Sequence, residues 1–416
     1  MSSGILYVTH RVPWPPDRGD RIRTWNILKF LSAHAPVDLA CLADEPVPEE
    51  TVAKLKSVTR RLAIIPHSGK QRYLRGLKSL LCGRSITEGM FESSALRNVI
   101  REWRCTGEWT SAIASSSGVA SFIEPPMTSP ATRRWVDFMD VDSQKWLDYA
   151  KTSGFPKSLI YAAEGRRLRA TEIRLTKSCD RLLVVSEAER QVFQDFCPTD
   201  RMLAVANGVD TNWFSPGVSN VVVPSCVFVG VMDYLPNADA VQWLAEHVWP
   251  QVRSRYPNAE LRIVGKSPSA DVQKLTAIEG VRVIGPVPDV RPWLHDSSCA
   301  VVPLRIARGI QNKVLEAMAC GRPVICSPAP LKGLNAEPGL HLLSAETPEE
   351  WVNTICRVFD DAVLRQELGL SGSAWVQTHH CWDACLEPLL ELTESVRAYS
   401  GKAASVNSRH ERGVKA

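Results

Sequence analysis

The chain has no apolar run that approaches the ~18–20 residues of a membrane-spanning helix. It has no Cys-x-x-Cys pair, and 12 cysteines in 416 residues are too sparse for a disulfide scaffold, so we expect reduced thiols and a cytosolic protein. Its 49 basic and 45 acidic residues leave a net charge of only +4, too little to indicate a nucleic-acid partner. The first ten residues lack the charged and apolar regions of a signal peptide. The chain is 44% hydrophobic and 23% charged, which excludes a disordered, collagen-like or coiled-coil protein.

Short apolar runs, typical of strands, alternate with helical patterns in two successive parts of the chain. Strands are expected at residues 5–9, 37–42, 61–65, 111–115, 135–138 and 181–185, with helices between them at positions such as 22–32 and 157–177. Turn formers crowd residues 198–225, after which strands are expected at 226–231, 260–264, 281–284, 299–303 and 323–326. The pattern predicts an α/β protein with two Rossmann-like domains, at residues 1–205 and 226–380. A linker at 206–225, a final helix at 381–398 and a disordered tail at 399–416 complete the prediction.

The loop at residues 15–20 follows the first expected strand, and ligands of open α/β sheets bind at that end of a strand. Gly19 has no Cβ and allows close approach of a ligand, which makes it a candidate donor-binding residue. The helix that begins just after it favours an anionic group. Asp17 and Arg18 are candidates for the acceptor side. A plain βα turn explains the same residues equally well.

Residues 307–325 read as strand, loop, helix and strand within the second half. The helix expected to begin near Asn312 directs its first N–H groups outward, and Arg305, Arg308 and Lys313 surround its start, a setting that suits a diphosphate. Glu316 lies on the same helix face as Lys313 and could accept hydrogen bonds from a ribose diol. The alternative is an ordinary surface ion pair. The predicted donor-binding residues here are Arg305, Gly309, Ile310, Gln311, Asn312, Lys313 and Glu316.

Residues 51–87 contain nine basic residues and no acidic one. From Tyr73 to Leu81, apolar residues interleave with the cations at near-helical spacing, and those cations include Arg72, Arg75 and Lys78. This pattern is typical of a basic amphipathic helix on an anionic membrane surface. A solvated helix face is an equal alternative, and an RNA-binding patch ranks below both.

The sequence resembles GT-B glycosyltransferases of family 4. The resemblance rests on Glu316 before the run Ala-Met-Ala-x-Gly-x-Pro-Val that begins at Ala317, and on residues 10–23, 137–146, 185–189 and 207–210. Together these segments are similar to the sugar transferases associated with exosortase/PEP-CTERM systems. The resemblance implies that Glu316 binds the nucleotide ribose. Arg308 occupies the position of the family's first glutamate, and residues 230–237 lack the family's usual Arg and Lys.

Residues 136–146 hold no histidine, although many relatives have one there near the reacting sugar. Asp140 and Asp142 are the acidic candidates that remain, and on an extended strand end they would point to the same side. One could orient the acceptor hydroxyl or accept its proton, for which Asp140 is favoured. For Asp142, or Ser143, a helix N-cap is an equal alternative.

The resemblance implies two Rossmann-like domains facing across a cleft, with the last helix crossing back to the first domain. It implies hexosyl transfer, with retention of configuration, from a nucleotide-sugar donor to a glycan or polyprenyl-linked acceptor in exopolysaccharide biosynthesis. Asp140, Arg308 and Lys313 are the predicted catalytic residues, and neither a metal, another cofactor nor a nucleic acid is expected. A metal site at His379, His380, Cys381 and Cys385 is disfavoured because ligands in one helix turn do not converge.

We expect a cytoplasmic protein that is peripheral on the inner face of the membrane. Two alternatives stay open: a nucleotide-sugar 2-epimerase of the same fold, and a non-catalytic nucleotide-sugar-binding partner in polysaccharide assembly.

Overall fold

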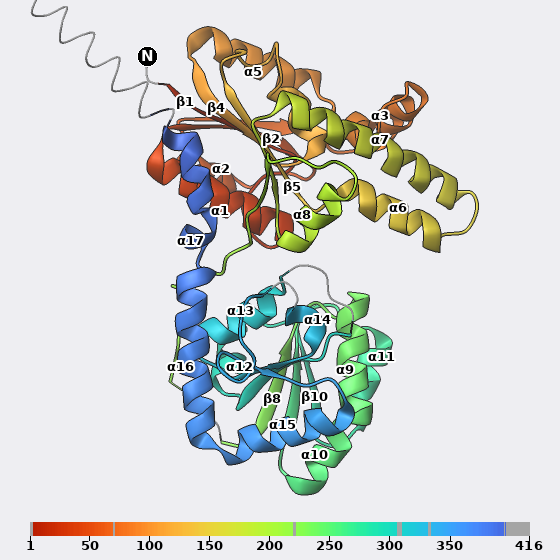
Figure 1. The fold of residues 1–416 in the computed structure, drawn as a ribbon, viewed down its shortest axis with the longest axis vertical. Helices are drawn as coiled ribbons and strands as arrows, with labels where there is room; N and C mark the ends of the chain where they lie inside the picture. The colour runs from red at the N-terminus through yellow and green to blue at the C-terminus, as the bar shows by residue number, and fades with distance from the viewer. Residues whose placement is uncertain are drawn as a thin grey trace, which may run out of the picture. The chain divides into compact units, whose positions relative to one another are not determined.

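The computed structural model describes residues 3–69, 71–218, 222–305, 310–331, 334–394 and 396. The chain divides into two compact units (Figure 1), one made of residues 1–205 with 386–416 and the other of residues 206–385. By its contacts, the stretch 206–225 that we expected to be a linker belongs to the second unit. The expected tail at 399–416 lies outside the described residues.

The first unit is built on a parallel sheet of seven described strands in the order β3-β2-β1-β4-β5-β6-β7. β1 and β2 are buried along their whole length, which explains why their residues are mostly apolar; Asp38, the one charged residue of β2, pairs with Arg60 and Arg61. The strands are β1 (Gly4–Thr9), β2 (Val37–Ala43), β3 (Arg61–Pro66), β4 (Trp109–Ala114), β5 (Arg133–Met139), β6 (Arg181–Val184) and β7 (Met202–Ala204).

Helices cover both faces of this sheet (Figure 1). They are α1 (Gly19–His34), α2 (Glu49–Lys56), α3 (Gln71–Leu81), α4 (Ile86–Phe91), α5 (Ser94–Thr106), the 3₁₀ helix η1 (Ser117–Phe122), α6 (Asp142–Thr152), α7 (Lys157–Ser178) and α8 (Glu187–Gln194). The end of the described chain returns to this unit, where Ser111 Oγ donates to Leu392 O at 2.8 Å.

The second unit holds a parallel sheet of six described strands in the order β10-β9-β8-β11-β12-β13. Its strands are β8 (Ser225–Val229), β9 (Glu260–Val264), β10 (Val281–Gly285), β11 (Cys299–Val302), β12 (Val324–Cys326) and β13 (Leu343–Ser344). Its helices are α9 (Leu235–His247), α10 (Trp249–Arg255), α11 (Ala270–Lys274), η2 (Leu275–Ala277), α12 (Arg291–His295), α13 (Asn312–Ala319), α14 (Pro328–Leu331), α15 (Pro348–Asp360) and α16 (Ala362–His379), followed by α17 (Trp382–Leu386) and η3 (Glu387–Leu389) at the border of the two units.

Both sheets reverse their strand order at one point. In the first unit β1 lies between β2 and β4, and in the second β8 lies between β9 and β11. Ligands of doubly wound sheets bind outside the carboxyl ends of the strands at such switch points. The carboxyl ends of β1 and β4, and of β8 and β11, are therefore the places to examine for function.

Three differences from the expected helices and strands concern the number of elements. The short edge strands β7 and β13 were not expected, because two or three residues carry too little periodicity to be recognised. The helix expected at 239–256 is two helices, with Val248 between them and Pro250 in the first turn of the second. The single helix expected at 381–398 is instead α17 followed by η3 and a further helical stretch at 390–394.

Candidate functional site

Lys313 lies in the first turn of α13, the helix that follows β11 at the switch point of the second unit. Its ammonium donates to the side-chain oxygen of Asn237 and lies 4.7 Å from the centre of the Phe228 ring. Asn237 is itself held in place, since its amide nitrogen donates to Val231 O at 2.8 Å. Burial lowers the pKa of Lys313 to about 8, with Glu316 opposing the shift. The ammonium is thus desolvated and held by a neutral amide.

Glu316 lies one turn further along α13. Burial raises the pKa of its carboxyl group to about 7, although the charge of Lys313 works in the opposite direction. Both side chains keep some surface accessible to solvent, yet the protein atoms around them disfavour either charge. Two opposite charges with pKa values moved towards each other are typical of a functional site more than of a solvated surface pair.

Arg305, the last described residue before residues 306–309, pairs with Asp239 through a contact of 3.0 Å between Nε and Oδ2. Two of the three predicted cations therefore contact the start of α9, Lys313 through Asn237 and Arg305 through Asp239. Arg308 and Gly309 lie outside the described residues. Ile310 and Gln311 precede α13, with Gln311 as its N-cap residue. Asn312 Oδ1 is buried and makes no hydrogen bond among the described residues.

The ends of β8 and β9 approach each other through two glycines. A Cβ placed on Gly265 would lie 1.7 Å from Gly230 O, and one placed on Gly230 would lie 2.8 Å from the amide nitrogen of Asn237, so neither position leaves room for a side chain. Met232 N–H then donates to Lys266 O at 2.9 Å, which places an exposed lysine beside the loop that lacks Arg and Lys. Sequence reasoning missed Lys266, although its position directly after β9 could have indicated it.

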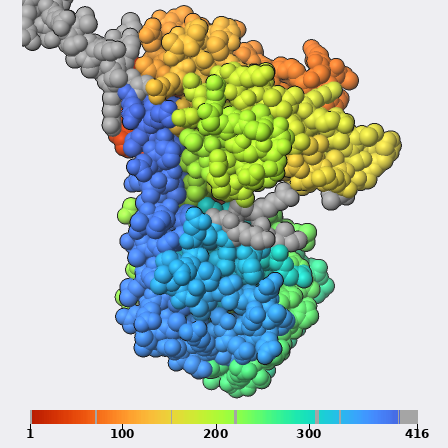
Figure 2. Space-filling view, viewed as in Figure 1, coloured from red at the N-terminus to blue at the C-terminus, as the bar shows by residue number. Residues whose placement is uncertain are grey.

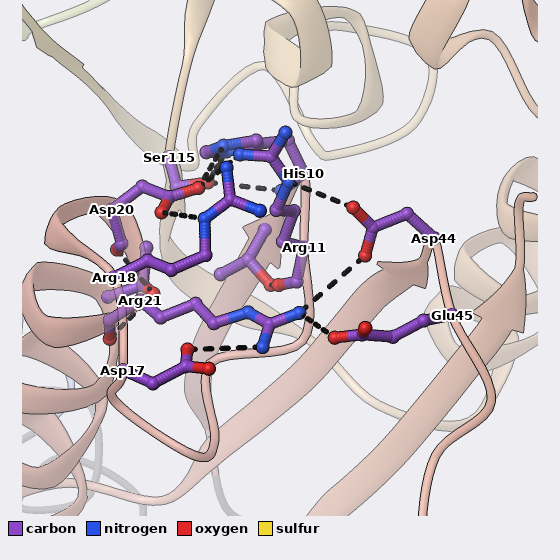
Figure 3. Close-up of polar contacts among 11 residues, drawn as sticks. His10, Arg11, Asp17, Arg18, Asp20, Arg21, Asp44, Glu45 and Ser115 are labelled. Atoms are coloured by element: carbon purple, nitrogen blue, oxygen red, sulfur yellow. Dashed lines mark hydrogen bonds and ion pairs between the residues drawn. The ribbon is translucent and has the colours of Figure 1, made fainter. Parts of the chain in front are cut away.

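The carboxyl edge of the first sheet carries a polar network around His10 (Figure 3). His10 follows β1, and its Nδ1 lies 2.9 Å from the Oγ of Ser115, which follows β4. Because that Oγ accepts the backbone N–H of His10 at 3.1 Å, its own hydrogen is available to Nδ1. Nε2, on the other side of the ring, lies 3.4 Å from Asp20 Oδ2. His10 and Ser115 were not predicted, since their pairing is made by the switch point and not by spacing along the chain.

The acidic and basic side chains at the carboxyl edge of the first sheet form ion pairs with one another. Arg11 contacts both Asp20 and Asp44, and Arg21 bonds Asp17 at 3.2 Å and Glu45 (Figure 3). Although burial opposes ionisation of Asp20, hydrogen bonds from His10 and Arg11 hold its pKa below the usual range.

The predicted loop residues Asp17, Arg18 and Gly19 take part in this arrangement. Arg18 is the N-cap residue of α1, with Nε 3.9 Å from Asp20 Oδ1. Gly19 is the first residue of α1, where a Cβ would meet no atom within 4 Å. The expected start near Ile22 was therefore three residues too late.

A buried ion pair connects this edge to the core of the first unit. Arg23 Nε and Nη2 donate to the two carboxylate oxygens of Asp137 at 2.7 and 2.9 Å, and Arg23 Nη1 donates to Val205 O at 2.8 Å. Arg23 is 1% exposed and Asp137 is fully buried. Sequence reasoning missed the pair because the two residues come from α1 and β5.

The geometry expected for Asp140 and Asp142 was wrong. β5 ends at Met139, whose positive φ of 66° turns the chain, and Asp142 is already the first residue of α6. The N-cap residue of α6 is Val141, so neither Asp142 nor Ser143 caps the helix.

Glu172 of α7 takes over that role. Its carboxylate accepts the backbone N–H of Ser143 at 3.0 Å and the Ser143 hydroxyl at 2.5 Å. Asp140 is exposed at the strand end and Asp142 lies 3.5 Å from Lys145. The pKa of Asp142 is raised by burial and, in addition, by the nearby charge of Asp140, with Lys145 opposing.

The three cations predicted for the acceptor or membrane side lie on α3. Arg72 donates to the Tyr73 hydroxyl at 2.9 Å, Arg75 Nη2 lies 3.2 Å from His67 Nε2, and Lys78 is exposed. Near the end of the second unit, burial lowers the pKa of His380 to about 4. Within the described parts of the chain, no group of three or more His, Cys, Asp or Glu side chains could hold a metal ion. No helix in those parts is long and apolar enough to cross a membrane.

Residues 223–361, most of the second unit, match the family model "Glycosyl transferases group 1". An uncharacterized glycosyltransferase of Haemophilus influenzae is 26% identical over 159 residues, which are 36% of this chain and 43% of the relative. The match thus spans less than half of that protein's length.

Solved structures match over nearly the whole chain. The sucrose-phosphate synthase of Thermosynechococcus elongatus has a TM-score of 0.66 at 16% identity, covering 95% of this chain and 100% of that one. The chain has the GT-B fold. HepE from Anabaena, in complex with UDP and glucose, has a TM-score of 0.63 at 13% identity and covers 94% of this chain and 100% of that one. The predicted GT-B fold is confirmed.

Proposed function

We propose that this protein is a glycosyltransferase that binds a nucleotide sugar in its second unit and transfers the sugar to an acceptor held by its first unit. The observation that carries the proposal is the pair Lys313 and Glu316 at the start of α13. Their pKa values, about 8 and about 7, are shifted by burial at the switch point of a doubly wound sheet. The matched family segment includes this helix.

The donor's diphosphate is the group that this site accommodates best. A desolvated ammonium held by the neutral amide of Asn237 gains more from a phosphate oxygen than a lysine already paired with a carboxylate. The N–H groups at the start of α13 add to the attraction. We propose that Lys313 and Arg308 stabilise the charge that develops on the departing diphosphate, and that Glu316 binds the ribose hydroxyls.

The remaining donor-binding assignments are the ones made from the sequence. We assign contacts with the donor to Arg305, Gly309, Ile310, Gln311 and Asn312, which flank or begin α13, and to Gly19 at the start of α1. The proposal requires no metal ion, because lysine, arginine and the helix start supply the positive charge.

Asp140 is the residue we assign to the acceptor. It is exposed at the carboxyl end of β5, and it lies near enough to Asp142 for their charges to interact. A carboxylate at that position orients an acceptor hydroxyl or accepts its proton. Asp17, Arg18 and Asp142 are assigned to the same side. The acidic and basic side chains around His10 are already paired, so this edge suits a neutral, hydroxyl-rich acceptor.

The finer assignments rest on the family resemblance. We propose a family 4 enzyme that transfers a hexosyl group with retention of configuration to a glycan or polyprenyl-linked acceptor in exopolysaccharide biosynthesis, within the exosortase-associated subgroup. We place it in the cytoplasm on the inner face of the membrane. UDP-glucose is the first donor to test, since the similar HepE structure contains UDP and glucose.

The test incubates the protein with a panel of radiolabelled nucleotide sugars, UDP-glucose first, and a bacterial lipid extract. Release of nucleoside diphosphate together with label in the lipid or glycan fraction is the expected result. An altered free nucleotide sugar would instead indicate an epimerase, and binding without turnover a non-catalytic partner. Asp140→Asn should lower acceptor-dependent release and leave donor binding unchanged. Asp271→Asn, an acid-to-amide change at an exposed position of α11, serves as the matched control.

A further inference from the structure

The helix α3 presents its large apolar side chains to solvent. Leu81 is 82% exposed, and Tyr73, Leu74 and Leu77 are each more than half exposed. These four residues fall on one face at helical spacing. A helix of a folded domain normally buries such a face, so α3 has the reverse arrangement.

The inner face of α3 shows why the apolar side chains point outward. It packs on α4 through its smallest residues: a Cβ on Gly76 would lie 2.9 Å from side-chain atoms of Ile86 and Met90. A Cβ on Gly89 would lie 2.3 Å from Ser79 Cβ. Arg167 of α7 donates to Leu80 O at 2.5 Å and holds the carboxyl end of α3. The helix is therefore fixed with its large apolar face outward.

The hairpin of α6 and α7 carries the second group of exposed apolar side chains. Phe155, in the turn, is 84% exposed, and Leu159 and Ile160 follow at 60% and 44%. Together with Tyr149 of α6 and the four residues of α3, these are all the large apolar side chains that are exposed among the described residues of the first unit. In Figure 2, α3 (orange) and this hairpin (yellow) project from the same side of that unit.

Basic residues accompany both groups. Lys78 is exposed at the border of the α3 face and Arg84 follows the helix, within the acid-free segment 51–87. Lys151 and Lys157 flank the turn of the hairpin and are exposed. Apolar side chains that enter the interface, with cations at headgroup level, are the requirements for binding an anionic bilayer. Exposed apolar side chains with a basic border favour an anionic bilayer over an uncharged apolar partner.

We propose that α3 and the α6–α7 turn form a docking surface for anionic phospholipid bilayers, with Tyr73, Leu74, Leu77, Leu81 and Phe155 inserted at the headgroup boundary. The surface does not depend on the reaction that the protein catalyses. It places the first unit at the membrane, where a lipid-linked acceptor would be reached.

The test is co-sedimentation of the full chain with vesicles of phosphatidylglycerol and phosphatidylcholine in equal parts, against vesicles of phosphatidylcholine alone. Binding to the anionic vesicles that weakens with salt is expected. Leu77→Glu combined with Leu81→Glu should weaken it at least about tenfold, and Lys78→Gln by less. Val363→Glu combined with Leu370→Glu places the same charges at exposed positions of α16 and should leave binding unchanged.

Three results would overturn the proposal. The first is equal binding of the wild type to both kinds of vesicle. The second is binding of the Leu77/Leu81 variant to anionic vesicles as tightly as the wild type. The third is a wild-type dimer that this variant separates, which would mean that a second copy of the chain covers the surface. The substituted positions are exposed, so an unchanged melting curve shows that the variant is folded. Donor hydrolysis measured without vesicles tests the proposed function separately, and its failure would leave the vesicle result standing.

Discussion

The carboxyl edges of the two sheets are built from the same strand order and differ in how their charges are satisfied. In the first unit, Asp20 is held in its ionised form by His10 and Arg11. In the second unit, Lys313 is held by a neutral amide, and burial shifts the pKa values of Lys313 and Glu316 towards each other. An edge whose charges are internally matched suits a neutral ligand, whereas an edge that desolvates a cation favours an anion.

The largest expected effect is a loss of stability in the first unit when the buried ion pair of Arg23 and Asp137 is broken. Asp137→Asn leaves the Arg23 guanidinium buried without a carboxylate, and removing one partner of such a pair costs about 3–5 kcal/mol. Urea denaturation should show this loss in the free energy of unfolding. Glu187→Gln, which breaks the exposed pair with Arg190, is the matched control and should change stability little. A small loss for Asp137→Asn would mean that the charges of the first unit are not structural.

We expect the affinity of the second unit for the donor to depend on pH. Lys313 loses its proton as the pH rises through about 8, and Glu316 loses its carboxylate as the pH falls through about 7. A diphosphate requires the first charge and a ribose diol favours the second, so donor affinity should be highest between about 7 and 8. It should fall on either side by up to about tenfold per pH unit.

Glu316→Gln separates the two limbs of this profile. The amide no longer titrates, so the decline of donor affinity on the acid side should disappear while the decline above pH 8 remains.

The same variant tests the stability of the free protein. Because burial raises the pKa of Glu316, its contribution to the free energy of unfolding is lost as the pH rises from about 4.5 to 7, and at pH 8 the ionised carboxylate opposes folding. The variant should therefore melt at a higher temperature than the wild type at pH 8. A lower melting temperature would contradict the shifted pKa.

The smallest expected effect is that of a chelator. Because Lys313 and the start of α13 supply the positive charge, EDTA should leave donor-dependent turnover unchanged in metal-free buffer. A loss of turnover that added Mg²⁺ or Mn²⁺ restores would show that the second edge needs a cation from solution, and the contrast with the first edge would need another explanation.

Much of the fold could be predicted because its central strands are buried on both faces. β1, β2 and β8 are recognisable as mostly apolar runs, and the shared face of Lys313 and Glu316 follows from helical spacing alone. The pairing of His10 with Ser115, and of Arg23 with Asp137, joins residues more than 100 positions apart, so no local pattern contains it. The turn at Met139 was missed since a left-handed conformation is rare for methionine.

The most direct test of the account is the melting temperature of the protein with and without UDP-glucose, for the wild type, Lys313→Met and Lys274→Met. Lys274 is an exposed lysine of the same unit, paired with Asp271 at 2.8 Å, and controls for the loss of one positive charge. A ligand that binds only the folded state raises its stability by about 2.7 kcal/mol at ~100 times its dissociation constant. The account predicts a clear rise for the wild type and Lys274→Met and little or none for Lys313→Met. An equal rise in all three proteins would contradict it.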